Sequence, residues 1–379
     1  MLETATTSRD WFSDSGASKL RDASTLSFHD LVARGESPKR AVIYKESEED
    51  AEQIELDLAR IGPSIHQYLL KETETEVDLK QDKEELVNDE LMQQYIAKIR
   101  RVLLAYCVRN PRVGYVQGHA DLLCFMLANT STGDNEEEAF WIYATIMEKV
   151  FPEDFFARNP KLHGFKVETA LLEELITKRL VPHIPRLAEI DLTALTTLLA
   201  CKWFVGLWVG ELPLPLLKDV WEAMLCDECG TIIHLVLALH LVRLAVNAIA
   251  TIPDGAHWDS SYIYKETLQR CRTLGAIDLR NVLEHANAVY NLSDEGVEDA
   301  RMRLRGALRF FSEEVRTLLQ SVHFQPIELQ RLHAEYTYAR TFSKKWERQR
   351  VRGVRPDFID NLIVRDFPTV CSQGHNLEI

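Results

Sequence analysis

Apolar residues in this 379-residue chain recur every three to four positions in nearly every segment that has a regular pattern. That spacing is typical of an amphipathic α-helix, whereas a half-buried β-strand alternates at every second residue. No convincing alternating run is present, and no Asn-Gly or Asp-Gly pair lies between β-branched runs, where it would indicate a hairpin. The sequence therefore predicts an all-α protein.

The charge balance argues against one class of partner. The chain carries 44 Lys and Arg residues against 58 Asp and Glu residues, which gives a net charge of −14. A field of that sign repels phosphate backbones, so we do not expect nucleic-acid binding. Basic protein partners remain open.

The longest apolar stretch spans residues 231–252 and contains His234, His240, Arg243 and Asn247. An arginine near the centre of a membrane span costs a few kcal/mol, so this stretch predicts a buried core helix and no membrane span. The seven cysteines are odd in number and are scattered mostly inside apolar segments, which indicates reduced thiols. The first residues lack the apolar core of a secretory signal. We expect a soluble protein of the cytoplasm.

The pattern also predicts how the chain is divided. Residues 1–27 are rich in Ser, Thr and Asp and are expected to be poorly ordered. A helix begins near Ser47, and Ser47 with Asp50 has the form of a capping box. Residues 71–90 form an expected mobile acidic loop before a strong helix over 90–109. Further helices are predicted from Glu136 and over 162–180, 192–209, 213–225, 231–251, 260–272, 277–290 and 294–321.

A C-terminal helical, partly basic extension is expected over residues 293–379. Its last predicted helix spans 327–352, and residues 299–355 carry a local charge of about +7. The rest of the chain then carries about −21, so a helix that lies on the acidic body is the favoured interpretation. A patch for an anionic membrane or an acidic partner is the alternative.

Common enzyme motifs are absent from the sequence. There is no GxxxxGK[ST] phosphate loop, no GxGxxG, no GxSxG and no HExxH. We therefore expect no nucleotide site in this chain. Cys226 and Cys229 form a CxxC pair, but a zinc site needs a second pair, and the nearest histidines lie on an apolar helix. No metal site is predicted.

Two polar groups stand out against the helical pattern, and the first is Asp57 with Arg60. Ile54, three residues before Asp57, lies on the apolar stripe of the predicted helix. Asp57 and Arg60 lie beside that stripe, one turn apart, so the carboxylate can hold the guanidinium. A held arginine at the rim of a packed face can be aimed at a partner. The alternative is an ordinary surface ion pair of a few tenths of a kcal/mol.

The second group is the segment from Asn110 to Gly118. Pro111 ends the preceding helix, and glycines at 114 and 118 permit unusual backbone angles. A tyrosine, Tyr115, and a glutamine, Gln117, stand between the glycines. Loops mounted on rigid helices are where functional side chains are commonly presented. The alternative is a plain helix–helix turn whose tyrosine packs.

Taken in this order, the two groups resemble the fingerprint of the TBC-domain Rab GTPase-activating proteins. Ile54, Asp57 and Arg60 match the IxxDxxR motif of that family, and residues 115–118 match its YxQG motif. The resemblance runs over about residues 28–290. The flanks that carry it include Arg101, Asn110, Gly114, Asp121, Phe140-Trp141, Trp203-Phe204, Glu211-Leu-Pro213 and Val220-Trp221.

The resemblance implies a multi-helix TBC domain over 28–292 that accelerates GTP hydrolysis by a Rab-family GTPase in its GTP-bound form. It implies that Arg60 is an arginine finger and Gln117 a glutamine finger, that Asp57 orients the arginine, and that Tyr115 shapes the turn and touches the partner. Gly118 and the flanking residues would support the site. No cofactor is implied, because the GTP and Mg²⁺ would belong to the GTPase. The family implies a role in vesicle trafficking, with peripheral association with endomembranes left open.

Three departures from the family pattern keep a second hypothesis open. Tyr44 stands where the family often has Trp, Ile61 where it usually has Thr, and His119-Ala120 where it usually has Met-Asn. These changes leave both polar side chains in place. The alternative is a catalytically silent TBC domain that binds a GTPase as an effector or scaffold, and a third hypothesis is an all-α interaction module unrelated to GTPases.

Overall fold

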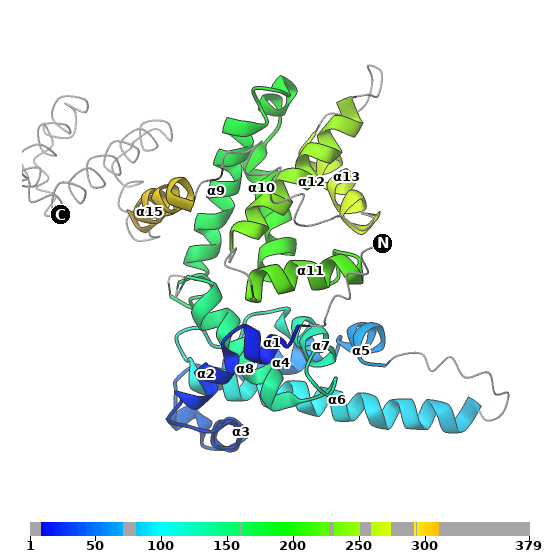
Figure 1. The fold of residues 1–379 in the computed structure, drawn as a ribbon. Coiled ribbons are helices and arrows are strands. Elements are labelled where there is room, and N and C mark those ends of the chain that lie inside the picture. The colour runs from blue at the N-terminus through cyan, green and yellow to red at the C-terminus, as the bar shows by residue number, and fades with distance from the viewer. Residues whose placement is uncertain are drawn as a thin grey trace, which may run out of the picture. The chain divides into compact units, whose positions relative to one another are not determined.

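The structure is a computed structural model that describes residues 9–70, 81–152, 154–159, 161–226, 231–250, 259–273, 292 and 294–310. Every regular element within these ranges is a helix (Figure 1), which confirms the predicted all-α fold. The chain divides into two compact units, Met1–Leu292 and Ser293–Ile379.

The helices of the first unit fall into an N-terminal and a C-terminal set. The N-terminal set is α1 (Trp11–Asp14), α2 (Ala17–Asp22), α3 (Phe28–Gly35), α4 (Ser47–Leu58), α5 (Gly62–Tyr68) and α6 (Gln81–Arg109). The C-terminal set is α7 (His119–Ala128), α8 (Glu136–Thr145), α9 (His163–Arg179), α10 (Leu192–Ala200), α11 (Leu214–Leu225), α12 (Ile232–Ala250) and α13 (Ser260–Thr273). Short 3₁₀ turns η1 (Arg40–Val42) and η3 (Pro185–Glu189) and π-helical turns η2 (Ile146–Val150) and η4 (Cys201–Val205) lie between them.

The N-terminal segment differs from its prediction. Residues 9–27 were expected to be poorly ordered, but they form the short helices α1 and α2. Asp10 caps α1 by accepting a hydrogen bond from the Phe12 amide at 3.1 Å. Trp11 is buried and stacks on Trp221 with 5.6 Å between ring centroids. Composition alone predicted disorder, because it does not show that the Trp11 side chain packs in the core.

The long helix α6 also corrects the sequence prediction. It begins at Gln81, so the expected acidic loop over 71–90 is wrong for residues 81–90, while 71–80 lie outside the described residues. Glutamate, lysine and leucine favour a helix by propensity.

Helix α4 begins at Ser47 as predicted, but the capping box is absent. The N-cap position is Glu46, and its side chain makes no capping hydrogen bond. Asp50 instead accepts hydrogen bonds from the Arg158 guanidinium. A carboxylate gains more from a charged donor than from a backbone amide, so the tertiary partner prevails over the local motif.

The helices of the first unit pack in two groups. Helices α3 and α4 pack against α6, α5 packs against α7, and α8 packs against α2, α6 and α7 (Figure 1). Helix α10 packs against α9 and α13, and α12 packs against α13. The largest fully buried side chains are aromatic and include Trp141, Trp203, Trp208, Trp221, Tyr106, Tyr143, Phe125, Phe140 and Phe204.

The predicted helix over 192–209 is interrupted. Helix α10 ends at Ala200, the chain continues as the π-helical turn η4, and Leu207 and Trp208 then adopt positive φ angles of 47° and 68°. Trp208 is fully buried, and its indole Nε1 donates to His234 Nδ1 at 2.7 Å. Burial of this indole with a satisfied donor compensates the strained backbone, an effect that periodicity does not reveal.

Helix α12 is a core helix, as its polar residues predicted. Its apolar side chains are buried over most of their surface, including Ile233, Leu235, Leu237, Leu241 and Val242. Over the ranges that the structure describes, no helix combines the length and the apolar character needed to cross a bilayer.

In the second unit the described helix is α15 (Asp294–Phe310). It begins where a helix was predicted over 294–321. The predicted helices over 277–290 and 327–352, the latter with the basic residues, lie outside the described residues.

Candidate functional site

The Arg60 side chain is presented to solvent just beyond the end of α4. Its side chain is 68% exposed. Its Nη2 donates to Asp57 Oδ1 at 2.8 Å, and its Nε donates to the Leu56 carbonyl oxygen at 3.2 Å. The last carbonyl groups of a helix lack intrahelical donors and carry a partial negative charge, so a cation is favoured there. The guanidinium is therefore exposed and held at two points.

Asp57 connects Arg60 to the second motif. Its side chain is only 9% exposed. While Oδ1 accepts from Arg60, Oδ2 accepts from the Tyr115 hydroxyl at 2.5 Å and from the Gly118 amide at 2.8 Å. Three donors satisfy this buried carboxylate, as a buried charge requires. The carboxylate fixes the end of α4 against the turn that carries Gln117.

The turn from Asn110 to Gly118 has the unusual backbone angles that its two glycines permit. The Asn110 carbonyl accepts hydrogen bonds from the Val113 and Gly114 amides at 3.1 and 2.9 Å. Gly114 and Gly118 have φ angles of 65° and 90°, which favour glycine. Between them the Gln117 side chain is exposed, and its carboxamide has no hydrogen-bond partner among the described residues. Its donor and its acceptor are both available.

Tyr115 acts in the structure as a neutral donor to Asp57. Its ring is partly buried. Burial raises the pKa of the Tyr115 hydroxyl well above its ordinary value, and the hydrogen bond to the Asp57 carboxylate raises it further. The proton therefore stays on the tyrosine at neutral pH and bridges the two motifs.

Replacing Tyr115 by phenylalanine should lower the free energy of unfolding by about 1–3 kcal/mol, because a hydrogen bond to a charged group is lost. Chemical denaturation with a fixed m-value measures this. Tyr95→Phe is the matched control, since the Tyr95 hydroxyl has no hydrogen-bond partner in the described part of the chain. Equal stability of the two variants would contradict a bridging role for the Tyr115 hydroxyl.

The departures from the family pattern lie in the interior. Ile61, His119 and Ala120 are buried, with exposures of 1%, 0% and 1%. His119 Nδ1 lies 2.8 Å from the Tyr143 hydroxyl, and Nε2 lies 3.1 Å from the Val205 carbonyl oxygen. These three side chains are therefore buried, whereas the Arg60 and Gln117 side chains are exposed.

His119 makes the stability depend on pH. Burial lowers the pKa of its imidazole from about 6.5 to about 4. Between these two values the unfolded chain binds more protons than the folded chain, so the free energy of unfolding falls as the pH drops from 6.5 to 4. The full decrease in the free energy of unfolding amounts to about 3 kcal/mol.

Urea denaturation at pH 7, 6, 5 and 4 tests this dependence. The wild-type protein should lose more stability across the series than His119→Met, which has no group to protonate. Parallel pH profiles for the two proteins would show that His119 is not the group responsible.

Other predicted residues occupy supporting positions. Ile54 is fully buried on the inner face of α4. Asn110 Nδ2 donates to the Tyr106 hydroxyl at 3.2 Å, which ties the start of the turn to α6. Asp121 accepts from the Ser64 hydroxyl at 2.5 Å and so joins the beginning of α7 to α5.

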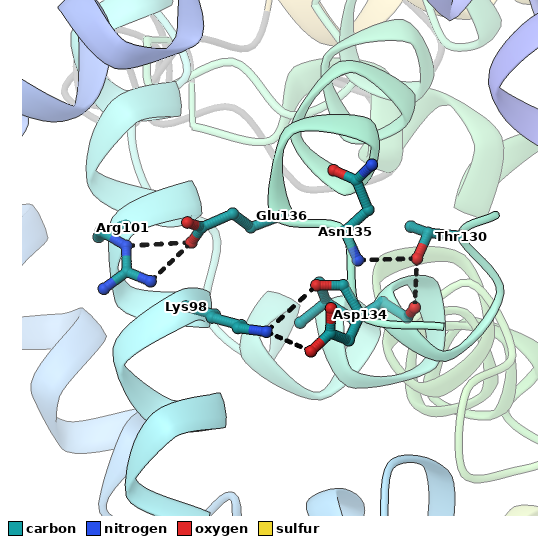
Figure 2. Close-up of polar contacts among 7 residues, drawn as sticks. Lys98, Arg101, Thr130, Asp134, Asn135 and Glu136 are labelled. Carbon is teal, nitrogen blue, oxygen red and sulfur yellow. Dashed lines mark hydrogen bonds and ion pairs between the residues drawn. The ribbon is translucent and has the colours of Figure 1, made fainter. Parts of the chain in front are cut away.

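Arg101 lies in a separate cluster of polar contacts (Figure 2). Its Nε and Nη2 contact Glu136 Oε2 at 3.0 and 2.9 Å, beside the Lys98–Asp134 ion pair. Glu136 is the first residue of α8, so Arg101 anchors that helix to α6. Within the described residues it makes no polar contact with the group formed by Asp57 and Gln117.

Two polar residues of this region were missed from the sequence. Asp50 and Arg158 pair with each other, and Asp50 also accepts a hydrogen bond from the Tyr115 amide at 3.2 Å. The signal that could have identified Asp50 is its separation of seven residues from Asp57, because two helical turns place both residues on the same face of the helix. Nothing local in the sequence indicates Arg158.

No metal centre is apparent in the ranges described, where no three His, Cys, Asp or Glu side chains are placed to hold an ion. Of the CxxC pair, Cys226 is described and Cys229 lies outside the described residues. Burial raises the pKa of the Cys226 thiol to about 11. This thiol is therefore protonated at neutral pH.

Fold and site together define an all-helical module that presents its candidate groups, one arginine and one glutamine, at the surface. The family model of the Rab-GTPase-TBC domain matches residues 32–246, which is more than half of the chain. The chain belongs to this family, as the resemblance of its two motifs predicted.

Individual relatives and a solved structure agree with this assignment. The chain is 27% identical over 235 residues to TBC1 domain family member 2B of Xenopus tropicalis, covering 60% of this chain and 21% of that protein. It is 28% identical over 211 residues to TBC1 domain family member 2A of Bos taurus, covering 55% and 19%. The chain thus matches about a fifth of the length of these relatives.

The solved structure is a crystal structure of the Chlamydomonas flagellar RabGAP TBC domain. It is similar to this chain with a TM-score of 0.51 and 22% identity, covering 73% of this chain and 76% of that one. At this identity the likeness shows the fold alone.

Proposed function

We propose that this chain is a GTPase-activating protein for Rab-family small GTPases in their GTP-bound form. One observation carries the proposal: a single buried carboxylate, Asp57, binds both the exposed Arg60 guanidinium and the backbone of the turn that presents the exposed Gln117 side chain. Membership of the Rab-GTPase-TBC domain family supports the choice of partner.

Arg60 is the residue that we assign to charge compensation. During GTP hydrolysis, negative charge is spread over the oxygens of the transferring phosphoryl group and must be stabilised. A guanidinium inserted from a partner supplies this stabilisation and is worth about 10³–10⁵ in rate. The Asp57 carboxylate and the Leu56 carbonyl restrict the guanidinium before the partner arrives, so less conformational entropy is lost on binding.

Gln117 is the residue that we assign to the attacking water. A carboxamide offers a donor and an acceptor together, so it can orient a water molecule toward the phosphorus. The Gly118 amide, one residue further on, is bonded to Asp57, which fixes the backbone beside Gln117. In this role Gln117 would replace the catalytic glutamine of the GTPase itself.

The nucleotide and its Mg²⁺ belong to the GTPase in this proposal. The chain carries no phosphate-loop motif. Its contribution is to complete the active site of its partner, with Tyr115 and Gly118 shaping the surface that the partner meets.

A single-turnover GTP hydrolysis assay against a panel of GTP-loaded Rab proteins tests the proposal. Acceleration with at least one Rab is the expected result. Binding of a Rab without acceleration would identify a catalytically silent scaffold. Neither binding nor acceleration would identify an interaction module unrelated to GTPases.

A further inference from the structure

Asp50 and Asp57 lie on the same face of α4, because seven residues correspond to two helical turns. Both carboxylates contact the turn that carries Gln117. Asp57 binds its end through the Gly118 amide, and Asp50 binds its middle through the Tyr115 amide at 3.2 Å. The two backbone amides flank Gln117 in sequence, so one helix holds the turn on both sides of this side chain.

Arg158 completes this arrangement from a second segment. Its Nη2 donates to Oδ1 and Oδ2 of Asp50 at 2.7 and 2.6 Å. The Asp50 side chain is 5% exposed and Arg158 is 27% exposed, so the carboxylate is almost fully desolvated and depends on its cation. The Arg158 amide also donates to the Arg112 carbonyl oxygen at 2.9 Å, which joins its backbone to the same turn.

Gly114 leaves the space that the guanidinium occupies. A Cβ atom at this position would lie 1.7 Å from Arg158 Nη2 and 2.6 Å from Asp50 Oδ2. The positive φ of 65° already favours glycine. The absence of a side chain therefore serves the Asp50–Arg158 contact as well as the backbone conformation.

We propose that Asp50 and Arg158 are positioning residues that set the place of Gln117 relative to Arg60. This inference rests on the proposed function. Arg60 stands at the end of α4, and the ion pair fixes the Gln117 turn to that same helix. A displacement of about 1 Å between reacting groups can reduce a rate by about 10²-fold, so the ion pair acts on the chemical step through the position of Gln117.

Replacing Asp50 by alanine should lower kcat for Rab-GTP hydrolysis by about 10- to 100-fold while changing KM little, because Arg60 and the exposed surface remain. Asp50→Asn keeps an oxygen for the Tyr115 amide and should recover part of the rate. Glu48→Ala is the matched control. It removes another α4 carboxylate paired with an arginine, Arg40 at 2.9 Å, which does not contact the turn, and it should retain the wild-type kcat.

A double-mutant cycle separates positioning from general weakening of the fold. In a Gln117→Ala background, Asp50→Ala should cost no further kcat, since the side chain that it positions is gone. An equal loss in both backgrounds, or an unchanged kcat in the single variant, would overturn the inference. Should Asp50→Ala fail to fold, Arg158→Gln at its partly exposed position carries the same non-additivity prediction.

Amide hydrogen exchange supplies a readout that does not require activity. In Asp50→Ala the Tyr115 amide should exchange faster, while the Gly118 amide, bonded to Asp57, keeps its protection. Unchanged protection at Tyr115 would overturn the positioning role even if the Rab assay succeeds. A wild-type protein that accelerates no Rab would refute the proposed function instead, and the exchange result would still decide whether Asp50 holds the turn.

Discussion

Replacing Arg60 by alanine should reduce the acceleration of Rab GTP hydrolysis by about 10³- to 10⁵-fold, which is the contribution of an arginine inserted in trans. The fold should remain intact, because the side chain is 68% exposed and its loss opens no core cavity. Asp57 keeps two donors in this variant, the Tyr115 hydroxyl and the Gly118 amide. Single-turnover hydrolysis and thermal unfolding, measured on the same preparation, check both statements.

A conservative change at this position should not rescue activity. Arg60→Lys should fail nearly as badly as alanine, since a compact ammonium cannot reproduce the planar, multiply donating guanidinium. Arg100→Ala is the matched control. Arg100 lies on α6, forms a bidentate ion pair with Glu55 on α4, and is not part of the candidate site. Normal acceleration by well-folded Arg60→Ala would remove Arg60 from the mechanism.

Replacing Gln117 by alanine should lower the accelerated rate by about 10²-fold or more, as expected for loss of a group that orients charge or water in the transition state. Gln117→Glu should fail as well, because a carboxylate accepts hydrogen bonds but cannot donate one. Gln93→Ala, at an exposed position of α6, should behave as the wild type. Stopped-flow phosphate release measures the three rates.

The partner provides a second test of Gln117. If Gln117 orients the water, a Rab whose own catalytic glutamine is replaced should still respond to the wild-type protein. The same Rab should not respond to Gln117→Ala. A substituted Rab that binds the wild-type protein but is wholly refractory would show that the GTPase's own glutamine orients the water.

Local interactions were predictable from the sequence, and long-range ones were not. The Asp57–Arg60 pair followed from a separation of one helical turn, and it is present. Asp50 looked like part of a capping box, but its partners Arg158 and Tyr115 are 108 and 65 residues away along the chain. A local motif carries no information about partners that only the tertiary fold brings close.

Contacts that only the tertiary fold creates also explain two other differences between the sequence prediction and the structure. Residues 1–27 have the composition of a disordered tail, yet within the described part, residues 9–27, Trp11 is buried against Trp221 in a helix. His119 follows directly after the candidate YxQG motif, and its position in the sequence did not show that it is fully buried. Period and propensity predict that a helix exists, whereas burial depends on what the remaining helices place against it.

The most direct test of the central claim is the affinity of the protein for its Rab in three nucleotide states. Aluminium fluoride with GDP imitates the transferring phosphoryl group, and a protein that stabilises the transition state binds such an analogue more tightly than the ground state. Titration calorimetry compares the affinities of the protein for its Rab loaded with GDP, with GDP and aluminium fluoride, and with a non-hydrolysable GTP analogue. We expect the tightest binding in the aluminium fluoride state, with that increment lost in Arg60→Ala. Equal affinity of wild type and Arg60→Ala for all three states would contradict the claim that this chain completes the active site of its partner.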